Sequence, residues 1–258
     1  MKTAVSNIAW PAEMDTEMLA YIRSLGFEGL EVAPTRLFPD APYEKTEEAG
    51  AYAAALYEQY HLRVCSMQSI LFGVTQNFFV SEEERKFLDG YLRRAIDFAG
   101  TIGCGNLVFG CPKNRIIQDA GQYGIAVEFF RSLGEYAATR GTVLSVEPNP
   151  VIYGTNFLNT TAEAFRFVRE VAHPGCMVNV DMGTMIYNEE PFVVLEQNAK
   201  WIRHIHLSEP NLVPIRPREL HKQLKSLPYD GYLSLEMKNT GDAGTVRAAL
   251  DYLRGVAV

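Results

Sequence analysis

The chain has 258 residues, 47% of them hydrophobic and 21% charged, which is the composition of a globular protein able to bury a large core. A formal net charge of −7 argues against a nucleic-acid partner, because binding by counterion release needs a basic surface. The length is close to the roughly 250 residues of one (β/α)8 barrel.

Eight short runs of β-type residues alternate with helical patterns along the chain. The predicted strands are residues 3–10, 27–32, 62–67, 106–110, 142–146, 177–181, 202–206 and 232–236. The predicted helices are residues 15–25, 46–60, 81–102, 121–140, 160–171, a segment starting at 191, 218–226 and a segment starting at 242. This alternation predicts an α/β fold, a single (β/α)8 TIM-barrel domain over residues 1–258.

Polar motifs mark where several helices begin. Ser81 and Glu84, like Thr160 and Glu163, have the spacing of a capping box, and Asp15 is a candidate N-cap. An open, doubly wound sheet is the alternative architecture, but no glycine-rich nucleotide-binding motif follows any predicted strand. The barrel is therefore favoured.

Cysteine usage and hydropathy suggest an intracellular protein. The four cysteines lack CxxC spacing and are expected to pack as small apolar residues rather than to bind zinc or form disulfides. No charged-then-apolar leader opens the chain, and no apolar run approaches the length of a membrane span. We therefore expect cytoplasmic localisation and no membrane partner.

Four consecutive predicted strands each deliver one metal-capable side chain where the strand gives way to a loop. These side chains are Glu147, Asp181, His206 and Glu236. Their separations match the length of a βα unit, which is about 30 residues. Because a parallel barrel brings the C-terminal ends of its strands to one face, these groups are predicted to converge there.

Three carboxylates and one imidazole form a hard ligand set, which suits Mn²⁺, Mg²⁺ or Co²⁺ better than a structural zinc, with Zn²⁺ as a substitute in crystals. Such an ion would hold two substrate oxygens and acidify the C–H beside a carbonyl. Glu147 and Glu236, from different sides of the barrel, could then exchange protons with a metal-bound enediolate. That chemistry is an epimerisation or isomerisation.

A single acid at a strand end is usually a helix cap or a solvated group, so the metal site rests on all four residues together. The other histidines are given structural roles. His204 is expected to point to the face opposite His206 and to pack there, whereas His61, His173 and His221 are expected at the surface near helix ends.

The second half of the chain resembles a known family. The motifs that carry this resemblance are residues 147–149, 155–160 and 206–211, together with Asp181 and Glu236. They are similar to signatures of the sugar isomerase/epimerase superfamily with xylose-isomerase-like TIM barrels, and most of all to ketose 3-epimerases of the tagatose and psicose type. The resemblance implies the same four metal ligands, a Glu147/Glu236 acid–base pair, and a homodimer or homotetramer.

Three positions depart from that family pattern. Gly154, Thr184 and Leu212 stand where the resemblance implies a substrate-contacting Glu, His and Arg. Metal binding and proton transfer are therefore expected to be kept, while recognition of the sugar is expected to differ.

Other charged residues are candidates for substrate binding. Lys113 and Arg115 follow the strand at 106–110 and could hold a phosphate or carboxylate, with a solvated basic loop as the alternative. Arg216 and Glu209, which follow the strand at 202–206, and Glu31, at the end of the strand at 27–32, complete the predicted set.

These observations predict a divalent-metal-dependent isomerase or epimerase of a keto-sugar, or of a phosphorylated or acidic derivative of one. A dehydratase or lyase of the inosose type on the same scaffold is an alternative enzyme. An endonuclease that cuts at abasic sites fits poorly, because its several-zinc site needs more than the five histidines present. A non-catalytic sugar-binding barrel is the alternative outside enzymes, but binding alone does not need two opposed carboxylates.

Overall fold

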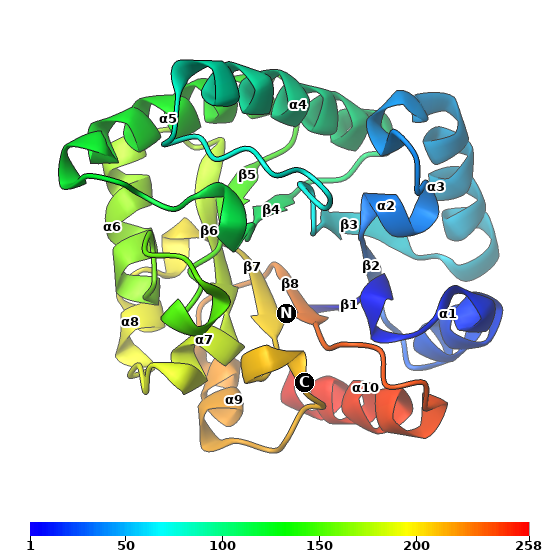
Figure 1. Ribbon diagram of the computed structural model, residues 1–258. Coiled ribbons are helices and arrows are strands. Elements are labelled where there is room, and N and C mark those ends of the chain that lie inside the picture. Colours follow the sequence, from blue (N-terminus) through cyan, green and yellow to red (C-terminus); the bar gives the residue numbers. More distant parts are fainter. Residues whose placement is uncertain (258) are drawn as a thin grey trace.

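The computed structural model describes residues 1–257, and eight parallel strands form a closed barrel in chain order (Figure 1). The strands are β1 (Lys2–Ser6), β2 (Gly29–Val32), β3 (Arg63–Met67), β4 (Leu107–Phe109), β5 (Leu144–Val146), β6 (Cys176–Asp181), β7 (Ile202–Leu207) and β8 (Tyr232–Leu235). β1 pairs with β8, with Val5 opposite Leu235, which closes the barrel. The predicted TIM-barrel fold is confirmed.

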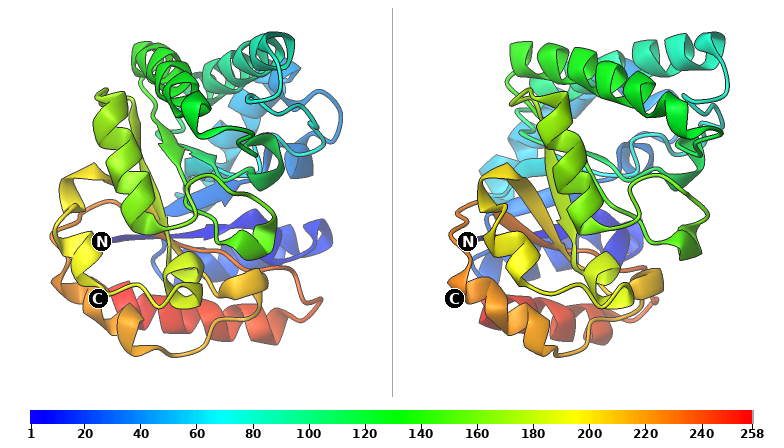
Figure 2. Two further views of the ribbon diagram at one scale, coloured as in Figure 1. Left: turned by 60° about the vertical axis from the view of Figure 1, so that its left-hand side comes forward. Right: turned by 90° about the vertical axis from the view of Figure 1, so that its left-hand side faces the viewer.

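Helices surround the barrel on the outside (Figures 1 and 2). They are α1 (Asp15–Ser24), α2 (Pro34–Leu37), α3 (Thr46–Tyr60), α4 (Glu82–Thr101), α5 (Tyr123–Thr139), α6 (Thr161–Val171), α7 (Met182–Tyr187), α8 (Val193–Glu196), α9 (Glu219–Gln223) and α10 (Ala243–Ala257). The short helices α2 and α7 are not among the predicted helices, and Asp181, predicted only as a strand end and metal ligand, also caps α7. Figure 2 also shows the N-terminus and the end of α10 on one side of the molecule.

Two predictions near the N-terminus are wrong, the end of the first strand and the capping role of Asp15. The first strand stops at Ser6, and a 3₁₀ turn follows, in which the Asn7 side chain accepts a hydrogen bond from the Ala33 amide at 2.9 Å. Asp15 does not cap α1, because its carboxylate accepts bonds from the Trp10 indole at 2.7 Å and from Arg36 at 2.6 Å. In both cases a contact with a distant segment replaces the local motif.

The capping residues predicted for later helices are largely confirmed. At the start of α6, Thr160 accepts from the Glu163 amide, and Glu163 accepts in return from the Thr160 amide, both at 3.2 Å. At α4, Ser81 accepts from the Glu84 amide at 3.1 Å, but the Glu84 carboxylate binds the Asn77 amide instead of completing the box.

An aromatic cluster fixes the loops that follow β3 and β5. Phe78 and Phe157, from these two loops, pack edge to face with centroids 6.1 Å apart. Phe130 of α5 and Phe167 of α6 pack against the same cluster at 5.9 and 5.5 Å. Each such pair contributes about 0.5–1.5 kcal/mol beyond the burial of its area. The two loops are thereby held in place at the C-terminal end of the barrel.

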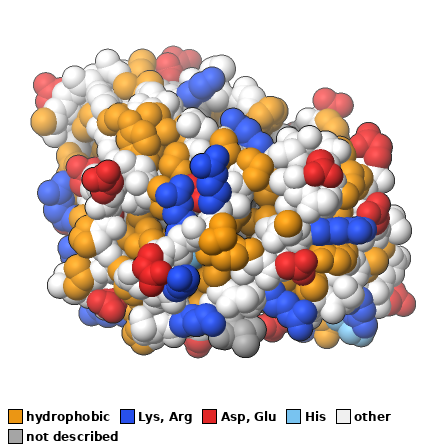
Figure 3. All heavy atoms as spheres, turned by 90° about the horizontal axis from the view of Figure 1, so that it is seen from below, with side chains coloured by type: hydrophobic (Ala, Val, Ile, Leu, Met, Phe, Trp, Pro, Cys, Tyr) orange, Lys and Arg blue, Asp and Glu red, His pale blue; other side chains and the backbone are white. Residues whose placement is uncertain are grey.

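The surface is mixed in character. On the face shown in Figure 3, acidic and basic side chains are interspersed with hydrophobic ones. The four cysteines are free, and Cys65, Cys104 and Cys176 are buried, as expected for small packing residues. No helix within residues 1–257 has both the length and the apolar character needed to cross a membrane.

Candidate metal and substrate site

The four side chains predicted as metal ligands lie together at the C-terminal end of the barrel. Glu147, Asp181, His206 and Glu236 each offer a ligand atom, and these atoms all lie within 4.8 Å of one another. All four residues are buried. Strand register explains the convergence, since Asp181 of β6 pairs with His206 of β7, while Glu147 and Glu236 directly follow β5 and β8.

His206 stands at the centre of the cluster. Its Nδ1 lies 2.9 Å from Glu147 Oε1 and 3.1 Å from Glu236 Oε2, and its Nε2 lies 3.0 Å from Glu31 Oε2. Burial opposes protonation of the ring, but the carboxylates of Glu236 and Glu31 outweigh it and raise the pKa of His206 well above its usual value. A proton on Nε2, donated to Glu31, leaves the Nδ1 lone pair directed at the cluster, as a metal-binding imidazole requires.

Two amides hold the Glu147 carboxylate. Asn179 Nδ2 donates to Oε1 at 2.7 Å, and Asn149 Nδ2 donates to Oε2 at 3.1 Å. Gly110 makes room for this carboxylate, because a Cβ on Gly110 would overlap Glu147 Oε2. The orientation of Glu147 thus depends on β4, β6 and its own loop.

Four hydrogen bonds hold the Asp181 carboxylate. It caps α7 by accepting hydrogen bonds from the Gly183 amide at 3.3 Å and the Thr184 amide at 2.8 Å. It also accepts hydrogen bonds from the hydroxyls of Thr184 and Ser208. Burial raises the pKa of Asp181, and the nearby Glu147 carboxylate raises it further. Asp181 is therefore fixed in position although the site disfavours its negative charge.

Glu236 has fewer partners. Its carboxylate contacts His206, and no hydrogen bond to a side-chain or backbone amide is present among the described residues. Burial raises the pKa of Glu236, although His206 partly offsets this. Of the two predicted acid–base residues, Glu236 is the one less restrained by hydrogen bonds.

The residues present fit a divalent cation. Three buried carboxylates crowd one imidazole, and burial together with repulsion from neighbouring carboxylates raises the pKa of Asp181 and of Glu236. A doubly charged ion would neutralise this excess, and carboxylate oxygens with one imidazole nitrogen suit Mn²⁺, Mg²⁺ or Co²⁺.

A cavity of about 480 Å³ opens onto the cluster. Glu147, Asp181 and Glu236 line it, together with residues of the loops after β3 and β4. Lys113 also lines this cavity and is exposed, which agrees with its predicted position at the mouth.

Arg115 does not lie at the mouth, contrary to the prediction. It is fully buried, and its guanidinium donates to the Glu147 carbonyl at 2.6 Å and to Asn149 Oδ1 at 2.5 Å. Burial lowers the pKa of Arg115 to about 10. Its role is to brace the turn after β5, because Asn149 in turn holds Glu147.

Three other predicted substrate residues also lie away from the described cavity. Glu31 is completely buried beneath His206. Glu209 is buried and paired with Arg218, whose Nε donates to Oε1 at 2.9 Å. Arg216 is exposed and contributes only its backbone amide, at 3.3 Å, to Glu209. The two acids thus have structural partners already.

Two expectations about histidines are wrong. His204 and His206 share a face, since both rings approach Glu31 Oε2, at 3.2 and 3.0 Å. Residues two apart in a strand point to the same side, so alternation should have placed them together. His221 is fully buried rather than at the surface, and its Nδ1 lies 3.2 Å from the Tyr252 hydroxyl.

Sequence reasoning missed the polar residues that support the ligands. Asn149, Asn179, Thr184 and Ser208 were not predicted as site residues, yet each bonds a carboxylate of the cluster. Spacing offered a signal for Asn179, which precedes Asp181 by two residues on the same strand and therefore faces the same way.

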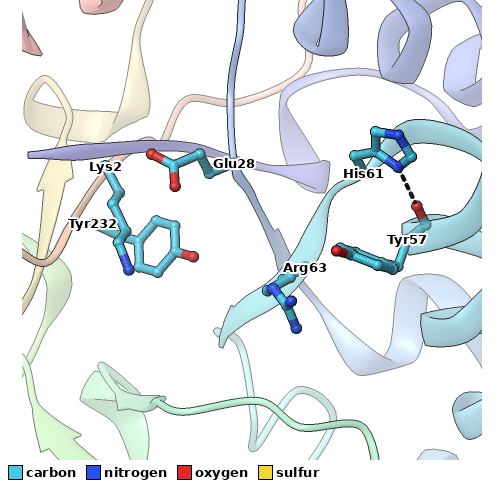
Figure 4. Close-up of a pocket in the computed structure, with 6 residues that line it drawn as sticks. All are labelled: Lys2, Glu28, Tyr57, His61, Arg63 and Tyr232. Atoms are coloured by element: carbon cyan, nitrogen blue, oxygen red, sulfur yellow. Dashed lines mark hydrogen bonds between the residues drawn. The ribbon is translucent and has the colours of Figure 1, made fainter.

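A second cavity, of about 320 Å³, lies at the opposite end of the barrel (Figure 4). Its cations sit over aromatic rings, with Lys2 Nζ 5.4 Å from the Tyr232 ring centre and Arg63 Cζ 4.6 Å from that of Tyr57. Among the described residues that line it, Glu28 is the one carboxylate. The carboxylate cluster therefore distinguishes the C-terminal end as the candidate site.

Comparisons with known proteins support the fold. The family profile described as xylose isomerase-like TIM barrel matches residues 19–256. The apo structure of 3-keto-D-glucoside 4-epimerase from E. coli is similar, with a TM-score of 0.79, 22% identity and 99% coverage of both chains. D-psicose 3-epimerase from Clostridium cellulolyticum H10, solved with D-tagatose, has a TM-score of 0.78, 18% identity and 99% coverage of both chains.

A third similar structure is an L-ribulose 3-epimerase, with a TM-score of 0.77 and 15% identity, covering 100% of this chain and 93% of its own. No curated protein sequence matches the chain. At these identities the structural likeness establishes the fold alone.

Proposed function

The chain belongs to the xylose isomerase-like TIM barrel family, and on that premise we propose that it is a divalent-metal-dependent epimerase or isomerase of a keto-sugar. The observation that carries this proposal is the cluster of Glu147, Asp181, His206 and Glu236 at a cavity. The names of the similar structures, which are sugar epimerases, agree with it.

The four clustered residues would hold the ion. When bound, a divalent ion would supply Lewis acidity to the substrate oxygens, an effect of several kcal/mol. The buried imidazole of His206, oriented by Glu31, and the capped carboxylate of Asp181 are fixed and suited to binding rather than to proton transfer.

Glu147 and Glu236 would move the proton. They come from β5 and β8, which are separated around the barrel by β6 and β7, and both line the cavity. One carboxylate would take the proton from the carbon beside the substrate carbonyl, and the other would return a proton to that carbon from the other side. The composition of the substrate is unchanged and its configuration is inverted, as an epimerase requires. General acid–base catalysis of this kind contributes roughly 10²- to 10⁴-fold.

The test is hydrogen exchange at carbon. The purified protein with Mn²⁺ would be incubated in deuterated water with ketoses, keto-sugar phosphates, 3-keto-glucosides and an inosose. We expect deuterium at the carbon beside the carbonyl of one of these classes, detected by mass spectrometry and NMR. Loss of water alongside exchange would indicate a dehydratase. If no substrate class shows exchange above the metal-free control, the proposed catalytic function is refuted, and a sugar-binding barrel is the remaining interpretation.

A further inference from the structure

Resting on this proposed function, the structure leads to an inference about the substrate class. We propose that the substrate is a keto-sugar that carries an apolar substituent, as in an aryl or alkyl keto-glycoside, and that the apolar side chains lining the cavity bind this substituent. Five observations support this assignment: the apolar side chains that line part of the cavity, the bonding of polar residues beside them, the exposure of Phe72, the volume of the cavity and the scarcity of positive charge.

The cavity lining combines a carboxylate cluster with a set of apolar side chains. Glu147 and Glu236, which follow β5 and β8, and Asp181 of β6 supply the carboxylates. The apolar set, which we call the apolar wall, consists of Leu71, Phe72, Val74, Val108 and Pro112. These residues belong to β4 and to the loops after β3 and β4. Because β4 pairs with β5, the apolar wall adjoins the carboxylate cluster at Glu147.

Gln68 and Asn114, which line the cavity beside the apolar wall, already have hydrogen-bond partners. Gln68 Nε2 donates to Ser6 Oγ at 3.0 Å, and its Oε1 accepts from Ser69 Oγ at 2.5 Å. The Asn114 amide donates to the carbonyls of Val74 and Gln76, at 3.0 and 2.7 Å. These groups hold the loops in shape, so sugar hydroxyls on this side would find few free hydrogen-bonding partners.

Phe72 is the most exposed of the large hydrophobic side chains in the described part of the chain, at 70%. Its loop is nevertheless braced, since the Phe72 amide donates to the Ser69 carbonyl at 2.9 Å and Tyr43 OH donates to the Ile70 carbonyl at 2.7 Å. An exposed ring on a braced loop at a cavity mouth presents a ready surface for an apolar or aromatic group.

Size and charge agree with a neutral, extended substrate. A volume of about 480 Å³ lies within the range of about 300–1,000 Å³ found for sites that bury drug-sized molecules, which are larger than one sugar ring. Among the described residues lining this cavity, Lys113 is the only lysine or arginine, and Arg115 is buried behind the wall. A phosphate would meet a single exposed lysine, whereas an apolar group would meet a wall of five side chains.

The experiment compares two ligands that differ only in the substituent. Dissociation constants of the phenyl and methyl glycosides of the same 3-keto-hexose would be measured by calorimetry with the Mn²⁺-loaded protein. We expect the phenyl glycoside to bind roughly tenfold more tightly, the gain that burial of an apolar ring supplies. Phe72→Ala should bring this ratio close to one with little change for the methyl glycoside, and Phe72→Tyr should preserve it.

Two control variants separate the apolar wall from other causes. Val80 is 55% exposed and lies in the same connection between β3 and α4 but does not line the cavity, so Val80→Ala should leave the ratio unchanged. Lys113→Ala should also leave it unchanged. A 6-phosphate of the keto-sugar that binds more tightly than the phenyl glycoside, and loses that advantage in Lys113→Ala, would overturn the proposal in favour of an anionic substrate.

Exchange at carbon, measured on the same ligands, distinguishes failure of this inference from failure of the proposed function. Phenyl selectivity that depends on Phe72 supports the apolar subsite even if no exchange occurs, in which case the proposed catalysis alone fails. Exchange with equal binding of the two glycosides overturns the apolar subsite and leaves the catalysis intact.

Discussion

Nε2 of His206 lies 3.0 Å from Oε2 of Glu31, so a buried carboxylate beneath the cluster determines which ring nitrogen His206 presents to its neighbours. Complete burial opposes ionisation of Glu31, but the attraction of His206 and His204 and their hydrogen bonds outweigh it and lower the pKa of Glu31. Glu31 is thus an anion held in place by two imidazoles rather than a residue that meets the substrate.

Glu31→Gln should weaken binding of Mn²⁺ by roughly 10- to 100-fold, the usual cost of removing a partner that orients a metal-binding histidine. Titration calorimetry with the purified variant checks this, and circular dichroism verifies that the barrel is intact. Glu28→Gln, an exposed change just before β2, is the matched control and should bind Mn²⁺ normally. Equal affinity in the Glu31 and Glu28 variants would rule out the orienting role.

Asp181→Ala should abolish the rise in melting temperature that Mn²⁺ produces. An ion present at 100 times its dissociation constant stabilises the folded state by about 2.7 kcal/mol, and this gain requires the ligand. Thermal unfolding with and without Mn²⁺ measures it. Thr184→Val is the control, because it removes a hydroxyl bonded to Asp181 but no ligand atom; it should lower stability by about 1 kcal/mol and keep the response to the ion. A full response in Asp181→Ala would remove Asp181 from the ligand set.

Glu236→Gln should retain Mn²⁺ but lose exchange at carbon by roughly 10²- to 10⁴-fold, because the amide keeps one oxygen for the ion and cannot accept a proton. Calorimetry measures ion binding, and mass spectrometry in deuterated water measures exchange. Glu147→Gln should behave similarly if both carboxylates transfer protons. Full exchange in either variant would point to a mechanism with one base.

Gly110→Ala should reduce activity by about 10²-fold while the protein stays folded. The added methyl group would displace the Glu147 carboxylate. A shift of a reacting group by about 1 Å lowers the rate by about that factor. The matched control is Gly124→Ala in α5, where an added Cβ meets no atom within 4 Å. That control should be active and more stable by about 0.4–1 kcal/mol. Exchange rates and melting temperatures of the two variants test the contrast, and normal activity in Gly110→Ala would contradict it.

His221 should make the protein less stable as the pH falls below neutrality. Burial lowers the pKa of His221 to about 4, whereas the unfolded value is about 6.5. Between these values the unfolded chain binds more protons, so the free energy of unfolding decreases as the pH falls, by up to about 3 kcal/mol at pH 4. Urea denaturation at a series of pH values measures this.

His221→Gln should flatten the stability profile between about pH 6.5 and pH 4. The control His61→Gln alters an exposed histidine and should keep the profile of the parent protein. A His221 variant with an unchanged slope would assign the pH dependence to other groups.

The pattern of short apolar runs, each followed by a polar loop, was sufficient to predict the barrel and the convergence of the four metal-capable side chains. Each strand is a short apolar run that ends at a polar loop, and closure of a parallel barrel places all such ends on one face whatever the loops do. For this reason the sequence alone predicts that Glu147, Asp181, His206 and Glu236 converge. The positions of helix caps such as Thr160 and Glu163 were predictable because their partners lie within one turn.

Tertiary structure alone decided which charged residues reach the cavity. Lys113 and Arg115 are two residues apart in one loop, yet the first is exposed at the mouth and the second is buried against the turn after β5. Glu31 and Glu209 each follow the pattern of a site residue, but their partners come from β7 and from the loop before α9. The Glu31–His206 pair joins residues 175 apart, and the Glu209–Arg218 pair joins residues nine apart across an irregular loop. Neither periodicity nor spacing encodes such pairings. The sequence by itself thus determined the fold and the ligand cluster, whereas packing between loops determined what a substrate would meet beyond it.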